Sequence, residues 1–128
     1  MLNKKKIIAI FNKNYFFEEF VKLLEEEGLE IKKNFAWCTD SNNKKYNSLI
    51  SKPTGCGYED LFRKDSLYDI IIVLDFNYTL PIKYRGSAIF LHCSETKTKF
   101  TEGCIAMEKK DLLKLIPHFT LSSSLIIY

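Results

Sequence analysis

The stretch LYDIIIVLDF, residues 67–76, constrains the fold more than any other part of the sequence. It is a nearly continuous apolar run, rich in β-branched side chains and bounded by polar residues. Such a run is typical of a strand that is buried on both faces. A second run, GSAIFLH at 86–92, predicts another buried strand. Because soluble proteins rarely leave an apolar face bare, other segments must cover both sides of strand 67–76.

The rest of the pattern predicts a β-rich fold, mainly β with flanking helices. Further strands are expected in four apolar segments: 5–11, 29–33, 104–107 and 124–128. Three helices are expected at 15–27, 58–64 and 109–116, the last ending before Pro117. The apolar stripe of helix 15–27 is the expected cover for strand 67–76. Residues 39–57 are dense in turn-forming residues and predict a loop.

Length and composition argue against several classes of protein, among them nucleic-acid-binding and membrane-spanning proteins. A chain of 128 residues is long enough for one domain with its own core. Its 19 basic and 16 acidic residues nearly balance and the lysines are scattered, so nucleic-acid binding is not expected. The N-terminal apolar run, IIAIF, is shorter than an export signal requires, and no segment is long enough to span a membrane. As written, the sequence predicts a soluble protein without an export signal.

The four cysteines give no sign of a metal centre. No two of them are spaced as Cys-x-x-Cys, and the adjacent His92 and Cys93 point to opposite faces of a strand. We therefore expect no metal site and no cofactor, and an even cysteine count alone assigns no disulfide. Cys38, Cys56 and Cys93 are interpreted as small buried apolar side chains.

His92 and Cys104 are the residues that suggest chemistry. His92 shares one strand face with Ala88 and Phe90 and stands where the strand meets a loop, which suits an accessible general base. Cys104 follows a turn at Gly103, and the backbone N–H groups of both residues could face a developing oxyanion. A thiol needs a neighbouring base to act as a nucleophile. The pair predicts cysteine acyl chemistry without choosing a substrate. A histidine satisfied by backbone groups at a strand end is the structural alternative.

The segments GSAIFLH, TEGCIAM and DLLKLI resemble the L,D-transpeptidase catalytic domain family, also called YkuD or ErfK-like. The family signature is a histidine at a strand end followed by Ser/Thr-x-Gly-Cys, and it is matched here by His92, Thr101, Gly103 and Cys104. The resemblance extends through 37–47 and 61–77 to a compact subgroup and covers residues 35–128. Many members carry arginine at the position of Ala106, and the family's glycine-rich first strands have no counterpart in residues 1–34.

The resemblance implies a single L,D-transpeptidase-like domain, a β-sandwich or flattened barrel that is incomplete at its N-terminus. Residues 1–34 are then a diverged strand–helix–strand segment, and 35–128 are the catalytic part. The implied activity is acyl transfer on peptidoglycan stem peptides, in which a thioester forms on the cysteine and a terminal D-amino acid leaves. The implied site residues are Cys104 and His92 for catalysis, Gly103 and Thr101 for the oxyanion turn, and Trp37, Asp40, Tyr46 and Ser87 for substrate binding.

Several alternatives remain open from the sequence. The same site could release the acyl group to water, as an L,D-carboxypeptidase does. The chain could instead be a non-catalytic peptidoglycan-binding remnant, or a generic domain with an idle histidine and cysteine. An enzyme should depress the pKa of Cys104, whereas a binding remnant need not. Peptidoglycan as substrate implies the periplasm or cell wall, although no export signal is visible.

Overall fold

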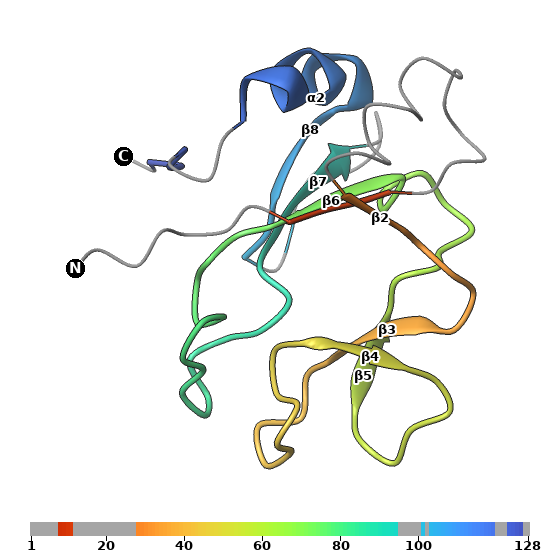
Figure 1. The fold of residues 1–128 in the computed structure, drawn as a ribbon, viewed down its shortest axis with the longest axis vertical. Helices are drawn as coiled ribbons and strands as arrows, with labels where there is room; N and C mark the ends of the chain where they lie inside the picture. The colour runs from red at the N-terminus through yellow and green to blue at the C-terminus, as the bar shows by residue number, and fades with distance from the viewer. Residues whose placement is uncertain (1–7, 12–27, 95–100, 102, 120–122, 127–128) are drawn as a thin grey trace.

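The computed structural model describes residues 8–11, 28–94, 101, 103–119 and 123–126. Within them the chain forms two β-sheets and one short α-helix (Figure 1). The larger sheet has the order β2-β1-β6-β7-β8, with β1 (Ile8–Phe11), β2 (Gly28–Glu30), β6 (Ile70–Val73), β7 (Phe90–Ser94) and β8 (Ile105–Glu108). The smaller sheet has the order β4-β3-β5, with β3 (Phe35–Cys38), β4 (Leu49–Ser51) and β5 (Tyr58–Asp60). Helix α2 (Lys109–Leu115) continues into a 3₁₀ helix, Ile116–His118.

Strand β6 lies at the centre of the five-stranded sheet. It is antiparallel to β1 on one side and to β7 on the other, while β1 and β2 are parallel, as are β7 and β8. All residues of β6 are buried, as expected for a strand covered on both faces. The prediction of a buried strand within the apolar run 67–76 is therefore confirmed, but the strand covers only its central residues, 70–73. Strands β1 and β2, from the first 34 residues, share one sheet with β6 to β8.

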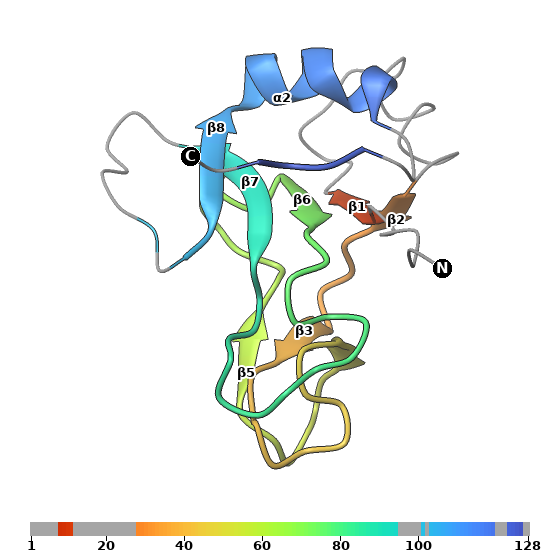
Figure 2. The same ribbon diagram turned by 90° about the vertical axis from the view of Figure 1, so that its left-hand side faces the viewer.

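The two faces of β6 have different covers. Ile71 and Val73 pack in one cluster with Trp37 of the three-stranded sheet. Ile70 and Ile72 pack in a second cluster whose other buried members are Leu91, Cys93, Leu112 and Ile116. Figures 1 and 2 show the five-stranded sheet between α2 and the three-stranded sheet. The cover expected from helix 15–27 lies outside the described residues.

Two predictions in the middle of the chain are wrong. The helix expected at 58–64 is instead β5 followed by bends, and β5 pairs antiparallel with β3. The loop expected throughout 39–57 contains β4, which pairs with the other edge of β3. Both strands are short and only partly buried, so their own sequences carry a weak signal. Pairing with the buried strand β3 supplies the structure that local propensity does not.

The second buried strand begins later than the expected 86–92. Gly86 and Ala88 have positive φ angles, +115° and 55°, which break the extended conformation before β7 starts at Phe90. Strand β7 then continues to Ser94. His92 consequently lies inside a strand, and the expected position at a strand end is wrong.

The remaining element predictions have mixed outcomes. The strand expected at 5–11 is present as β1 over its described residues, and the strands expected at 29–33 and 104–107 correspond to β2 and β8 with shifted ends. The helix expected at 109–116 corresponds to α2. Pro117 lies in the following 3₁₀ helix, at a first-turn position where its missing N–H costs nothing. The expected C-terminal strand is wrong for residues 123–126, which form no strand.

Candidate functional site

The register between β7 and β8 brings His92 and Cys104 to one face of the five-stranded sheet. The strands are parallel, with His92 opposite Ala106. Moving two residues back along both parallel strands places Cys104 opposite Phe90, just as Ala106 is opposite His92. Residues that lie opposite each other on paired strands point to the same face of the sheet, and so do alternate residues of one strand. The two residues of the expected pair therefore lie on the same side of the sheet, offset along the strand direction.

Cys104 is a half-buried thiol with two backbone partners. Its S–H donates to the carbonyl oxygen of Ala88 at 3.1 Å, and its sulfur accepts from the N–H of Phe90 at 3.4 Å. Burial raises the pKa of Cys104, the Phe90 N–H opposes this increase, and the Glu59 carboxylate adds to it. The resting thiol is consequently protonated near neutral pH. The sequence led us to expect a depressed pKa, and the structure gives the opposite direction.

His92 is buried, with 4% of its surface exposed. Its Nδ1 lies 2.7 Å from the carbonyl oxygen of Cys93. Because a carbonyl can only accept, Nδ1 carries the hydrogen and a neutral ring keeps its lone pair on Nε2. The ring of Tyr68 packs edge-on against the imidazole, with centroids 5.4 Å apart. Among the described residues, Nε2 has no hydrogen-bond partner and Cys104 is not bonded to His92.

The turn before Cys104 depends on Gly103 and Thr101. Gly103 has φ +93°, which side chains disfavour, and a Cβ at this position would lie 3.4 Å from Cδ1 of Ile89. The hydroxyl of Thr101 donates to the carbonyl oxygen of Cys104. The sharp turn expected at Gly103 is therefore confirmed. Thr101 contributes by fixing the backbone of the cysteine, while a direct role in oxyanion binding stays a prediction.

Asn47 links the three-stranded sheet to the cysteine. The side chain is buried, and its Oδ1 accepts from Trp37 Nε1 at 2.7 Å and from the Ala88 N–H at 2.9 Å. Its Nδ2 donates to the carbonyl oxygen of Asn77 at 2.5 Å. Ala88 is thus held in its positive-φ conformation, with its carbonyl toward the Cys104 thiol. Sequence reasoning missed Asn47, because nothing in its local sequence separates it from the other asparagines of this loop.

A cluster of hydrogen-bonded polar side chains lies beside the His92 imidazole, which contacts the Tyr68 ring of this cluster. The Tyr68 hydroxyl donates to Glu59 at 2.5 Å, and the Arg63 guanidinium lies 5.2 Å from the centre of the Tyr68 ring. Arg63 also forms a two-point contact with Asp65, at 2.9 and 2.5 Å, which lowers the pKa of that carboxyl. Burial, followed by the Glu59 carboxylate, raises the pKa of Tyr68, so its hydroxyl stays protonated. These residues were also missed, because only the fold brings them to His92.

The four residues expected to bind substrate lie in different environments. Trp37 is 1% exposed and packs against Phe90, with ring centroids 5.1 Å apart. Tyr46 is also buried. Asp40 is partly exposed and accepts from the N–H of Asn42 at 3.0 Å, while Ser87 is partly buried beside Ala88. Their roles in substrate binding stay predictions, and buried Trp37 has almost no surface to offer in this conformation.

The described ranges contain neither a metal-binding cluster nor a membrane-spanning helix. No group of three or more histidine, cysteine, aspartate or glutamate side chains is arranged there to hold a metal ion. Within the same part of the chain, no helix combines the length and apolar character that crossing a membrane requires.

Comparison with known proteins adds no family assignment. No protein-family model, no curated protein and no solved structure matches the chain. The β-rich architecture and the geometry around Cys104 and His92 are therefore the observations on which a function can be argued.

Proposed function

We propose that this protein is a cysteine acyltransferase of the L,D-transpeptidase kind, acting on peptidoglycan stem peptides. The observation that carries the proposal is the contact of His92 Nδ1 with the Cys93 carbonyl, on the sheet face that also holds Cys104. The bond from Nδ1 to the Cys93 carbonyl leaves the Nε2 lone pair to accept a proton from a nucleophile. The sequence resemblance, in turn, is what selects peptidoglycan as the substrate class. Such a substrate implies action in the periplasm or cell wall.

The proposed reaction begins from the protonated thiol of Cys104, with His92 acting as the base through Nε2. When a stem peptide binds, the thiol leaves the Ala88 carbonyl and gives its proton to Nε2 of His92 as sulfur attacks the substrate carbonyl. The backbone N–H groups of Gly103 and Cys104 stabilise the oxyanion that forms. His92 returns the proton to the departing D-amino acid, which leaves a thioester on Cys104. An acceptor amine then takes the acyl group, or water does so in the carboxypeptidase variant.

The raised pKa of Cys104 is compatible with this general-base route. A buried thiol without a cationic partner rests protonated, so proton transfer accompanies attack instead of preceding it. General-base catalysis typically contributes about 10²- to 10⁴-fold to a rate. In free enzymes the catalytic hydrogen bonds are often long and shorten only with substrate bound, so the missing contact between the two side chains does not exclude the pair.

Intact-mass spectrometry of the protein incubated with a stem tetrapeptide tests the proposal. We expect an acyl adduct that maps to Cys104, together with a released terminal D-amino acid. Cys104→Ser should abolish the thioester, whereas Cys93→Ser, a change on the opposite sheet face, should retain it. Adding an acceptor amine or only water then separates transpeptidase from carboxypeptidase products. A folded parent protein that forms no adduct contradicts the proposal.

The second candidate is peptidoglycan binding without catalysis. It is favoured by the same raised pKa of Cys104, because a binding protein does not need a reactive thiol. A sedimentation assay with purified peptidoglycan separates the two. Binding by the parent and by Cys104→Ala to the same extent, without any release of D-amino acid by the parent, would support this candidate.

A further inference from the structure

Within the connection between β6 and β7, residues 76–86 form a loop that exposes large apolar side chains. They are Phe76, Leu80, Ile82 and Tyr84, and the exposed fractions of Leu80 and Tyr84 reach 78% and 81%. No other stretch of similar length in the described part of the chain exposes as many large apolar side chains. Single exposed apolar side chains are normal on a protein surface, whereas several in one segment indicate an interaction site.

Hydrogen bonds of the Asn77 side chain hold loop 76–86 in shape. Its Oδ1 accepts from the Ile82 N–H at 2.7 Å, and its Nδ2 donates to the carbonyl oxygens of Ile82 and Gly86 at 2.9 and 2.8 Å. Tyr84 has φ 66°, a conformation that bulky side chains disfavour. Such a conformation persists only where the surrounding structure imposes it, and it is frequent at binding sites. The apolar side chains are therefore presented by a preformed loop, so little ordering is needed when a partner binds.

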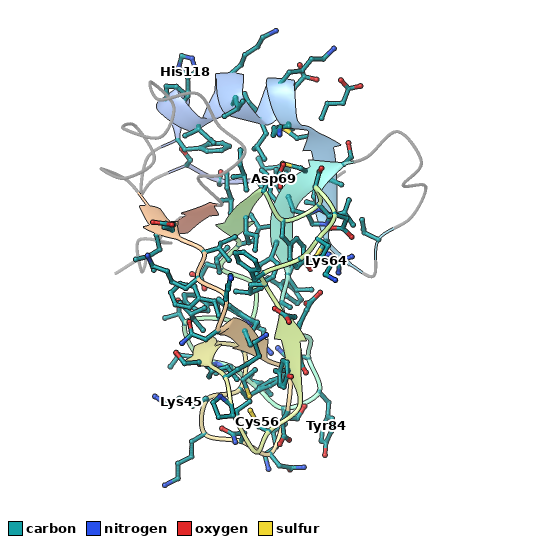
Figure 3. The ribbon with its side chains drawn as sticks, turned by 90° about the vertical axis from the view of Figure 1, so that its right-hand side faces the viewer. Lys45, Cys56, Lys64, Asp69, Tyr84 and His118 are labelled. Atoms are coloured by element: carbon teal, nitrogen blue, oxygen red, sulfur yellow. The ribbon has the colours of Figure 1, made fainter. Side chains whose placement is uncertain are left out.

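A second loop, residues 40–47, lies beside loop 76–86. The Lys83 ammonium donates to the side-chain oxygen of Asn42 at 3.1 Å, which joins the two loops. Figure 3 shows Lys45 and Tyr84 at the same end of the molecule, opposite α2. The two loops therefore form one surface at this end.

This surface carries an excess of positive charge. Its basic side chains are all exposed, and they are Lys44, Lys45, Lys83 and Arg85. The carboxylates of the two segments are Asp40 and, one residue before loop 76–86, Asp75, and each already accepts a hydrogen bond from its own segment. Exposed cations beside apolar side chains match the chemistry of an anionic bilayer surface, where lipid phosphates lie above the acyl chains. In Figure 1 loop 76–86 projects beside the three-stranded sheet, so it can reach such a layer.

We propose that loop 76–86 docks the protein on an anionic lipid bilayer. Leu80, Ile82 and Tyr84 enter the headgroup layer, while the basic side chains of both loops face the lipid phosphates. Tyrosine suits this position, because its ring is apolar and its hydroxyl is polar. The protein lies on the membrane surface and does not span the bilayer. The proposal does not depend on the proposed enzymatic function.

Sedimentation of the full chain with lipid vesicles tests the proposal. We expect binding to vesicles of phosphatidylcholine mixed with phosphatidylglycerol, and at least about fivefold weaker binding to phosphatidylcholine alone, because each basic side chain near an anionic surface contributes about fivefold. Binding to the mixed vesicles should weaken when salt is raised from about 0.1 M to about 1 M, which shortens the Debye length from about 10 Å to about 3 Å.

Two variants separate the apolar and the basic contributions. Leu80→Ser/Ile82→Ser should weaken binding to the mixed vesicles by at least about tenfold, because apolar burial is lost. Lys83→Glu/Arg85→Glu should weaken it by at least about 25-fold. The matched control is Lys64→Glu/Lys114→Glu, which makes the same change in net charge at two exposed lysines outside both loops. The control should bind at least about tenfold more tightly than Lys83→Glu/Arg85→Glu. All of these side chains are exposed, and thermal unfolding checks that each variant folds as the parent does.

Three results would overturn the proposal. The first is a folded parent protein that does not sediment with the mixed vesicles. The second is equal binding by the control and by Lys83→Glu/Arg85→Glu, which would mean that net charge alone drives adsorption. The third is a dimer that Leu80→Ser/Ile82→Ser abolishes, in a parent that ignores vesicles, which would assign this surface to a second copy of the chain. None of these readouts requires acyl transfer, so the two proposals can fail separately.

Discussion

The two faces of β6 and β7 are built from alternating residues of the same strands, but they are covered by different kinds of side chain. The face toward α2 is apolar, and its buried residues are Ile70, Ile72, Leu91, Cys93, Leu112 and Ile116. The face toward the three-stranded sheet holds His92 and Cys104, and its surroundings include the hydrogen-bonded side chains of Asn47 and Tyr68. The helix side is mostly hydrocarbon, with an ion pair between Lys109 of α2 and the buried Asp69, whereas the loops of the small sheet bring polar groups that already have partners.

Two cysteines make the same contrast. Burial raises the pKa of Cys93, on the helix side, to about 11. Burial also raises the pKa of Cys104, and a backbone N–H opposes the increase in both cysteines, from Ile70 for Cys93 and from Phe90 for Cys104. Cys104 differs in donating its S–H to the Ala88 carbonyl. The comparison shows that neither thiol rests as a thiolate near neutral pH. On the proposed function, the reactivity of Cys104 therefore arises from the groups beside it when substrate binds.

The largest expected effect is the difference between substitutions of His92 and Leu91, which are adjacent in β7 but lie on opposite faces of the sheet. His92→Ala should lower thioester formation by about 10²- to 10⁴-fold, because the base is lost. Leu91→Ala should leave the rate per folded molecule nearly unchanged and lower the free energy of unfolding by about 2–5 kcal/mol. Single-turnover acylation and urea unfolding measure the two quantities. Equal loss of rate in both variants would remove the distinction between the faces.

The next effect is the pH dependence of stability that Cys93 introduces. Its folded pKa, about 11, lies above the ordinary value, so the folded state holds the proton more tightly. The stabilisation is complete below about pH 9 and is lost as pH rises toward 11, amounting to about 2–3 kcal/mol. Urea unfolding from pH 7 to 11 should show this decline, and Cys93→Ala should reduce it. An unchanged decline in the variant contradicts the assignment.

Substitution of Asn47 should give a smaller loss of stability and test how the face toward the three-stranded sheet positions Cys104. Asn47→Ala leaves the Trp37 and Ala88 N–H groups without their acceptor, which should cost about 1–3 kcal/mol. Alkylation of Cys104 should also become faster, because the Ala88 carbonyl that accepts its hydrogen is released. Asn43→Ala, in the same loop, is the control, since Asn43 contacts only the nearby Lys45 N–H through its side chain among the described residues. If both variants alkylate Cys104 at the parent rate, Asn47 has no role in positioning.

The smallest effect concerns the turn. Gly103→Ala should cost about 1–2 kcal/mol, because a side chain disfavours φ +93°. Gly55→Ala, where a Cβ meets nothing within 4 Å, should change stability by less than about 0.5 kcal/mol. Thermal unfolding measures both. A neutral Gly103→Ala would mean that the turn before Cys104 is easily remodelled.

Sequence patterns predicted the elements whose signal is local. The unbroken apolar run identified β6, and helical spacing identified α2. They failed at β5, where Tyr58–Asp60 form a strand only because β3 lies beside them. The pair of His92 and Cys104 was found from residue types, but the direction of the Cys104 pKa was not. That direction depends on Ala88, Phe90 and Glu59, which only the fold brings near the thiol.

The most direct test of the account is the pH dependence of Cys104 alkylation in the parent protein and in His92→Ala. The account holds that the resting thiol is protonated by its burial and its Ala88 contact, and that His92 acts only when substrate is present. We therefore expect the rate of reaction with iodoacetamide to rise through pH 9 without an earlier plateau. His92→Ala should shift this profile by less than about half a pH unit. A plateau reached below pH 7 in the parent and lost in the variant would show a preformed thiolate–imidazolium pair and contradict the account.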